Sequence, residues 1–302
     1  MKLIPYCCLF VLLLSSCSVA QIDSTAPDGA LANEMEDTST EEVFSGEIQT
    51  QVSEKDGMRM VYVPAGKFTM GVTEEIAAAQ CSKYGSMCER MWYRVEVPPH
   101  TVKLDAFWID QTEVTNAMYA LCVNAGQCTE PHLMDYMVEP LFFGKVEYED
   151  HPVTIVDWEQ AAAYCAWAGR RLPTDAASEK AARGTDARTF PRGHTHPDAT
   201  LAIFHRAVET TPPVASYPNW MSLYGALDMA GNISEWVADW YVPYSSDKQT
   251  NPTGPQNGDE RVFRGGDWNS DASGLRTTYR QHTTPDFYDI GVGFRCAVSA
   301  EN

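Results

Sequence analysis

Six cysteines in the body of the sequence are the residues whose chemistry is most readily assigned. They are Cys81, Cys88, Cys122, Cys128, Cys165 and Cys296. A thiolate metal site would favour C-x2-C spacing with partner histidines, and these cysteines do not have it. An even number of cysteines in an exported chain instead predicts three disulfides, for which fifteen connectivities are possible. Closeness in the sequence suggests Cys81–Cys88 and Cys122–Cys128, which would leave Cys165 to pair with Cys296.

Three histidines in the segment HTHPDATLAIFH offer a second kind of chemistry. His194 and His196 stand two residues apart, and His205 follows them. Imidazoles at this spacing on a loop can chelate a divalent transition metal. The alternative is a solvated loop rich in proline and glycine, and we favour this alternative.

The stretch RVFRGGDWNSDASGLRTTYR, residues 261–280, combines a double glycine with small polar, basic and aromatic side chains. It contains neither cysteine nor histidine, and therefore lacks the soft ligands that a redox-active transition metal prefers. Its composition leaves two interpretations open, a reactive centre of another kind or a shaped binding surface.

Local patterns predict the elements that must position these residues. Residues 58–71 and 100–115 alternate apolar side chains with others, which is typical of short strands. Helices are expected over residues 115–126, 157–169 and 174–184, each running from an N-capping side chain to a glycine. The rest of the chain is rich in Gly, Pro, Asn and Asp. A few helices followed by a loop-rich, strand-poor half predict an α+β fold rather than a doubly wound parallel one.

Composition and the N-terminus indicate an exported, acidic protein. The 302 residues include 22 basic and 41 acidic side chains, a net charge of −19, which argues against nucleic acid as a partner. Residues 1–16 have one lysine and an apolar run too short to span a membrane, as in a signal peptide. Residues 14–17, LSSC, resemble a lipobox, although an ordinary signal peptide with a chance cysteine is the alternative.

A lipobox makes Cys17 the expected lipid anchor. The serine that follows it favours the outer membrane of a Gram-negative bacterium as the location. Residues 17–56 are expected to form a flexible acidic tether, because they contain ten acidic side chains, one lysine and few aromatic residues. The folded domain is then expected over residues 57–302.

Four segments of this domain together resemble the formylglycine-generating enzyme family, also called the sulfatase-modifying factor family. The segments are FWIDQTEVTNAMY (107–119), HPVTIVDWEQAAAYCAWAGRRLPTDAASEKAARG (151–184), YGALDMAGNISEWVADWY (224–241) and RVFRGGDW…YDIGVGFRCA (261–297). The resemblance covers almost all of residues 57–298 in the family's order. It implies a C-type-lectin-like α+β fold with little regular secondary structure, and a disulfide that joins Cys165 to Cys296.

The resemblance also bears on catalysis. Active members of the family oxidise a substrate cysteine with copper held by two cysteines after the double glycine, and Ser270 and Leu275 stand at these positions here. A hydroxyl binds soft copper poorly and an alkyl group does not bind it. We therefore expect neither copper nor iron and no catalytic residues. Asp267, Trp268 and Ser270 are instead expected to form a binding groove for an envelope protein or peptide. The alternative is an oxidoreductase of the same superfamily with an unrecognised metal site.

Calcium is the one cofactor that the resemblance favours. Matched to a calcium-binding turn of the family, the segment 224–241 supplies the side chains of Asp228 and Glu235 and the carbonyl oxygens of Gly231 and Ile233. These are hard oxygen ligands of the kind that calcium prefers. The alternative is that both acids are ordinary exposed side chains of a turn.

Overall fold

The two strands at residues 59–63 and 66–70 are neighbours in the sequence but belong to different sheets. The computed structural model describes residues 46–86, 88–134, 140–198, 200–202, 204 and 211–300. Strands β1 (Thr50–Val52), β2 (Arg59–Val63), β5 (Phe107–Asp110) and β11 (Ala297–Ser299) form one antiparallel sheet in the order β1-β2-β5-β11. A second sheet contains β3 (Gly66–Met70), β4 (His100–Leu104) and β7 (Gln249–Thr250) in that order. The strand pattern predicted for residues 58–71 and 100–115 is thus confirmed.

The third sheet carries the stretch that contains the double glycine. Its strands are β10 (Val292–Phe294), β6 (Ser234–Trp240), β8 (Arg261–Arg264) and β9 (Arg280–Thr283), in the order β10-β6-β8-β9. Strands β8 and β9 pair antiparallel, from Arg261 opposite Thr283 to Arg264 opposite Arg280. Residues 261–280 therefore form one strand, a long loop and the first residue of the next strand.

Three of the five described α-helices begin at the predicted capping side chains. They are α3 (Asn116–Asn124), α4 (Trp158–Trp167) and α5 (Asp175–Arg183). Asp157 and Gln160 form a reciprocal capping box at the start of α4, which satisfies two otherwise unpaired backbone groups. Short 3-10 helices cover Arg94–Glu96, Val146–Tyr148 and Pro218–Trp220.

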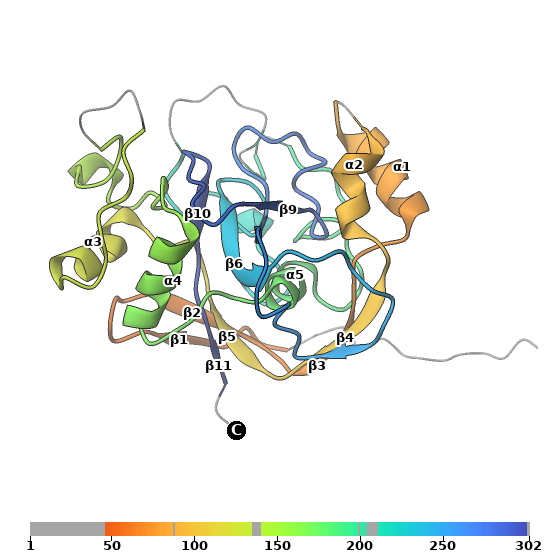
Figure 1. Cartoon of the computed structure of the whole chain (residues 1–302), viewed down its shortest axis with the longest axis horizontal. Helices are drawn as coiled ribbons and strands as arrows, with labels where there is room; N and C mark the ends of the chain where they lie inside the picture. The colour runs from red at the N-terminus through yellow and green to blue at the C-terminus, as the bar shows by residue number, and fades with distance from the viewer. Residues whose placement is uncertain are drawn as a thin grey trace, which may run out of the picture. The chain divides into compact units, whose positions relative to one another are not determined.

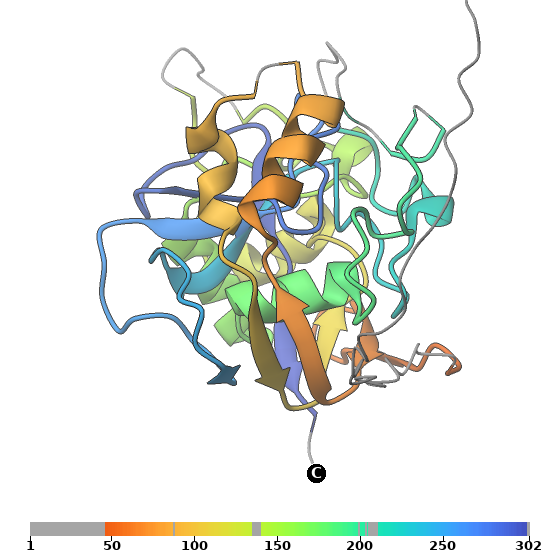
Figure 2. The ribbon, with the colours of Figure 1, turned by 90° about the vertical axis from the view of Figure 1, so that its right-hand side faces the viewer.

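Helices α1 (Glu74–Tyr84) and α2 (Arg90–Tyr93) were not predicted. The signal for α1 is nevertheless present, because Thr73 accepts a hydrogen bond from the Ile76 amide and two glutamates occupy the first turn. The Cys81–Cys88 disulfide links the end of α1 to the segment that precedes α2. Figure 2 shows this helical pair, coloured orange, above the β3–β4 hairpin.

Helix α5 occupies the centre of the domain. All nine of its residues are buried, and it contacts strands β3, β6 and β8. Figure 1 shows it between β6 and the β3–β4 hairpin, with α3 and α4 on one side and α1 and α2 on the other. A helix buried on every face must satisfy its polar side chains internally, and α5 does so through the ion pairs described below.

The three disulfides are those suggested by the sequence and implied by the resemblance. Cys165–Cys296 joins α4 to the start of β11 across 131 residues, and both cysteines are fully buried. Cys122–Cys128 closes a short loop after α3. The disulfide prediction is confirmed.

The folded region begins before residue 57. Strand β1, at residues 50–52, pairs with β2, and Asp56 forms a buried ion pair with Arg170. The boundary expected at residue 57 is therefore too late, because the acidic character of the segment conceals a strand and a buried carboxylate. The predicted signal peptide, Cys17 and His205 lie outside the described residues. Among the described residues, no helix is long and apolar enough to cross a membrane.

Candidate functional site

The loop after β8 is folded tightly by its two glycines. Gly265 and Gly266 have φ values of +98° and +64°, a conformation that costs other residues free energy. A Cβ atom on Gly266 would lie 2.5 Å from the Gly274 carbonyl oxygen, so a larger residue cannot be accommodated there without a shift of the backbone. The Gly265 carbonyl accepts a hydrogen bond from the Gly231 amide at 2.9 Å. The double glycine thus holds the loop against the turn that precedes β6.

Asp267 and Ser270 bond to each other. The Ser270 hydroxyl donates to Asp267 Oδ1 at 2.8 Å and accepts from the Asp267 amide at 3.0 Å. Burial raises the pKa of Asp267, although the hydrogen bonds from Ser270 and Asn269 oppose this effect. The hydroxyl at the first of the two cysteine positions is therefore engaged within the loop.

Leu275, which stands at the second of the two expected cysteine positions, lies in the core. Leu275 is fully buried and packs in a small apolar cluster with Phe190, Ala202, Trp220 and Ala230. The side chain therefore contributes to packing. Over the described part of the chain, no group of three or more His, Cys, Asp or Glu side chains is arranged to hold a metal ion.

The two described histidines of the 194–205 segment have separate partners. His194 Nδ1 lies 3.2 Å from the Thr189 hydroxyl, and His196 Nδ1 lies 2.5 Å from the Pro197 carbonyl oxygen. The His196 ring also packs against Tyr84, with 5.3 Å between the ring centroids. Each imidazole is thus engaged in a local contact.

A cavity of about 380 Å³ lies between this loop and the α1–α2 segment. Its lining residues are Cys81, Ser86, Trp92, Asn269, Ser270, Asp271, Ser273, Gly274, Arg276 and Tyr279. Of the three residues expected to form the groove, Ser270 lines the cavity, whereas Asp267 and Trp268 are not among its lining residues. Asp267 is used to fold the loop, and the Trp268 amide donates to the Asn232 carbonyl at 3.0 Å.

The opposite wall of this cavity could not be predicted from the 261–280 stretch. Ser86 joins this wall to the loop, since its amide and its hydroxyl both donate hydrogen bonds to Asp271 Oδ2, at 2.8 and 3.2 Å. Trp92, from α2, keeps 46% of its surface exposed at the cavity. The local signal that could have located this wall is the pair of nearby cysteines, Cys81 and Cys88.

Buried ion pairs fix the loop from below. Arg276 donates two hydrogen bonds to the carboxylate of Glu96, at 2.5 and 2.7 Å, and both side chains are buried. The Thr278 hydroxyl donates to the same carboxylate at 2.6 Å. A planar guanidinium that engages a carboxylate through two nitrogens fixes direction as well as distance. The cavity floor is therefore anchored to the 3-10 helix at residues 94–96.

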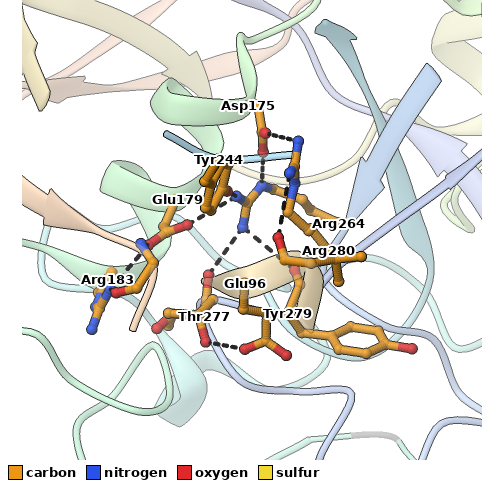
Figure 3. A network of polar contacts seen from close by, with 12 residues as sticks. Glu96, Asp175, Glu179, Arg183, Tyr244, Arg264, Thr277, Tyr279 and Arg280 are labelled. Carbon is orange, nitrogen blue, oxygen red and sulfur yellow. Dashed lines mark hydrogen bonds and ion pairs between the residues drawn. The ribbon is translucent and has the colours of Figure 1, made fainter. Parts of the chain in front are cut away.

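The same support continues into helix α5 through Arg264. This side chain pairs with Asp175, donates to Glu179 at 2.9 Å and donates to the Tyr244 hydroxyl at 2.6 Å. Arg280, at the start of β9, pairs with Asp175 at 2.7 Å. Figure 3 shows these side chains converging from α5, β8 and β9. Both ends of the loop are thus held on one buried helix.

A neighbouring buried carboxylate gives this region a pH dependence. Asp239 accepts a hydrogen bond from the Asp175 amide at 2.8 Å and lines a second cavity, of about 190 Å³. Burial and then the charge of Asp175 raise its pKa from 3.8 to about 7. The folded chain therefore keeps a proton on Asp239 at pH values where the unfolded chain has lost it.

Replacing Asp239 by asparagine should remove one pH-dependent component of stability. Because the folded-state pKa lies above the unfolded one, this component is fully present below pH 4 and is lost as the pH rises to about 7. The slope is at most about 1.4 kcal/mol per pH unit. Urea unfolding of both proteins at pH 4 to 7 measures the effect, and D239N should gain on the wild type as the pH rises. Parallel profiles would contradict the assignment, and the exposed-site variant D259N should follow the wild type.

The acidic turn before β6 is buried rather than exposed. Asp228 and Glu235 are 5% and 2% exposed, and Asp228 Oδ2 accepts from the Ala215 amide at 2.6 Å. Burial raises the pKa of both carboxyl groups. Both oxygens of Glu235 are bound by Arg295, at 2.6 and 2.7 Å. The alternative of ordinary exposed acids is therefore wrong, and Glu235 already has a cationic partner.

Left-handed backbone at two residues other than glycine marks this turn. Asp228 has φ +55° and Asn232 has φ +62°. Such conformations cost free energy and occur where surrounding contacts or function require them. Gly231 and Ile233, whose carbonyls were expected to bind calcium, lie within the same turn.

Comparison with known proteins relates these features to one family. Residues 45–300 match the family model described as "Sulfatase-modifying factor enzyme 1-like domain". The formylglycine-generating enzyme of Bos taurus is 30% identical over 79% of this chain and 74% of its own length. The hercynine oxygenase of Mycolicibacterium smegmatis is 32% identical over 78% of this chain and 60% of its own length. The serine/threonine-protein kinase pkn1 of Chlamydia caviae is 34% identical over 79% of this chain, which spans only 37% of that kinase.

Two solved structures share the fold. PvdO from Pseudomonas aeruginosa matches with a TM-score of 0.62 and 24% identity, over 82% of this chain and 97% of its own. Treponema denticola variable protein 1 matches with a TM-score of 0.63 and 22% identity, over 85% of this chain and all of its own. At these identities the likeness concerns the fold alone, and it confirms the predicted loop-rich α+β architecture.

Proposed function

Because the chain belongs to the sulfatase-modifying factor enzyme 1-like family, we propose that it is a member that uses the fold for binding and lacks the copper chemistry. The residues at the two cysteine positions support this proposal. The Ser270 hydroxyl is bonded to Asp267, and Leu275 is fully buried among apolar side chains. A hydroxyl group binds soft copper poorly, and the alkyl group of leucine does not bind it.

The cavity of about 380 Å³ between α2 and the 267–279 loop is the proposed binding site, and it is the observation on which the proposal chiefly rests. Buried ion pairs hold its floor, which reduces the entropic cost of ordering the site when a ligand binds. Trp92 offers an apolar face, and Asn269 offers hydrogen-bonding groups. This combination suits a peptide segment of an envelope protein, whose backbone and side chains need both kinds of contact.

Site-specific photo-crosslinking in intact cells would test this assignment. A photoreactive residue at position 92 should form an adduct with an envelope component, because this position lines the cavity. The same residue at position 146 should not, since Val146 is 78% exposed and lies outside the cavity lining. Ser270→Trp, which places a large side chain in the cavity, should abolish the adduct from position 92. Equal labelling at both positions, or no effect of S270W, would reject the cavity as the binding site.

An envelope location forms part of the proposal. The lipobox-like LSSC at residues 14–17 and the acidic segment that follows it support a lipid-anchored protein whose partners lie in the envelope. The mass of the N-terminal peptide from purified protein tests the anchor. A diacylated Cys17 is expected, and an unmodified N-terminus at another residue would contradict it.

An oxidoreductase is the second candidate function, because the hercynine oxygenase relative shares 32% identity with this chain. Elemental analysis of protein purified with disulfides intact and without chelator distinguishes the two candidates. We expect no stoichiometric copper or iron. About one atom of either metal per chain, together with oxidation of a thiol substrate, would favour the oxidoreductase.

Calcium is proposed as a structural ion at the acidic turn. The buried donor atoms of the turn support this proposal, because Asp228 is 5% exposed and the buried Asn232 Oδ1 atom has no hydrogen-bonding partner among the described residues. Asp228 and the carbonyl oxygens of Gly231 and Ile233 would hold it. A bound calcium ion would supply positive charge and crosslink the turn, and it would take no part in a reaction.

A further inference from the structure

One buried oxygen atom of Glu113 has no hydrogen-bonding partner in the described part of the chain. The residue follows β5 and is fully buried, and its Oε1 accepts a hydrogen bond from Asn232 Nδ2 at 3.0 Å. Its Oε2 atom and the Oδ1 atom of Asn232 have no hydrogen-bonding partner among the described residues. A buried oxygen left unpaired costs free energy, more so when it carries charge. A cation at this position would remove that cost.

Every N–H group of the Arg295 guanidinium already donates a hydrogen bond. Arg295 Nε and Nη2 donate to Glu235, Nη1 donates to the carbonyls of Asp110 and Gln111, and Nη2 also donates to Leu227. A guanidinium has five N–H groups, and these five contacts use all of them. Glu113 and Asp228 therefore receive no hydrogen bond from Arg295.

Glu113 and Asp228 belong to one cluster, because Glu113 bonds to Asn232 and both Asp228 and Asn232 are left-handed residues of the same turn. Burial, and after it the charge of Asp228, raises the pKa of Glu113 well above its ordinary value. Such a pair needs either a shared proton or a cation between its members.

We infer that Glu113 supplies the second carboxylate of the calcium site, in the place that the family resemblance gives to Glu235. This inference rests on the proposed calcium ion. A divalent cation would balance the two carboxylates that Arg295 does not reach, and carboxylate oxygens are the ligands calcium prefers. Asn232 holds Oε1 of Glu113 by its amide group and so leaves Oε2 for the ion.

The assignment gives the ion a long-range structural role. Glu113 and Asp228 come from segments that are far apart in the sequence, and the Leu227 amide already donates to the Gln111 carbonyl at 2.7 Å. The next residue, Val114, donates its amide to the Phe294 carbonyl at 3.0 Å. Calcium held by Glu113 would therefore join the segment after β5 to the turn that leads into β6.

Calcium titration by calorimetry, with melting temperatures in calcium and in chelator, tests the assignment on the mature chain with its disulfides intact. E113Q should weaken calcium affinity at least tenfold and remove the calcium-induced rise in Tm, with a calcium-free Tm no lower than that of the wild type. E235Q should lower the calcium-free Tm, because it disrupts the pairing of Arg295, and should keep the calcium-induced rise. The exposed-site control E147Q should match the wild type.

The outcomes separate the assignment from the calcium proposal itself. Wild-type affinity retained in E113Q, or loss of the calcium response in E235Q alone, would overturn the role of Glu113 and leave calcium binding in place. A wild-type chain that does not respond to calcium would overturn both. If E113Q does not fold, E113D provides the same test, because its shorter carboxylate should bind calcium more weakly than Glu113 does.

Discussion

Replacing Arg264 by leucine is expected to destabilise the domain by about 3–5 kcal/mol, the range found when one partner of a buried ion pair is removed. The guanidinium is 4% exposed and contacts Asp175, Glu179 and Tyr244. Leucine would leave carboxylate oxygens in the interior without their donors. Arg280 would still pair with Asp175 and Arg183 with Glu179, which keeps the loss from being larger. Urea or guanidinium unfolding, with the disulfides intact, measures this difference.

The same substitution at an exposed ion pair provides the control. Arg90 pairs with Glu74 at 2.5 Å, and both side chains are largely exposed to solvent. Water and salt screen such a pair, and R90L should leave the unfolding midpoint unchanged. An equal loss in R264L and R90L, or a loss below about 1 kcal/mol in R264L, would show that the buried network does not stabilise the domain as argued.

The effect of R264L should extend to binding. Arg264 is the last residue of β8, and Gly265 and the loop that lines the 380 Å³ cavity follow it directly. Loss of the anchor on α5 would increase the range of conformations that the loop samples. Even under conditions in which R264L is folded, photo-crosslinking from position 92 should therefore be weaker than in the wild type.

Features encoded by neighbouring residues were predictable. Asp157 and Gln160, three residues apart, specify the start of α4 through a capping box, and Thr174 caps the start of α5 by accepting a hydrogen bond from the Ala177 amide. Thr73 begins α1 by the same rule, and this signal was available although it was not used. Sheet membership was not predictable, because β2 and β3 are separated by only two residues and yet pair with different partners.

The same distinction, between features set by neighbouring residues and features set by distant ones, applies to the candidate site. The tight turn at Gly265, and the serine and leucine at positions 270 and 275, can be interpreted from the sequence. Glu113 and Glu96 could not be, because each acts on residues more than a hundred positions away, Asn232 and Arg276 respectively. A lone glutamate in a segment after a strand or in a short 3-10 helix carries no local signal that it will be buried, and its partners become known only from the fold.

The buried charges explain how a loop-rich domain can present a defined surface. Loops contribute few backbone ladder bonds, so side-chain contacts must restrict them. Here Arg276 and Arg280 tie the loop to Glu96 and Asp175. Each pair also imposes a direction, which apolar packing alone does not. These buried ion pairs therefore hold the base of the loop in one position beneath the cavity.

Removal of the Cys165–Cys296 disulfide is expected to have the largest effect of any covalent change. In the chain-entropy treatment, closing a loop with a sequence separation of 131 restricts the unfolded chain by about 5 kcal/mol, against about 2 kcal/mol for the Cys122–Cys128 loop. C165A/C296A should therefore lose about two and a half times as much stability as C122A/C128A. Cys122, Cys165 and Cys296 are all buried in one apolar cluster, so both variants add a packing loss and the difference between them reflects loop length.

Urea unfolding of the two double variants tests this order. The fold places the long-range bridge where its loss would affect several elements, because Cys296 lies between β10 and β11 and its amide donates to Asp110 at 2.8 Å. Arg295, beside it, contacts Glu235 and thereby the acidic turn. If calcium binds that turn, the long-range variant should also bind it more weakly, whereas C122A/C128A should not. Equal destabilisation of the two variants would mean that residual structure in the unfolded chain, rather than loop closure, sets the stability of this domain.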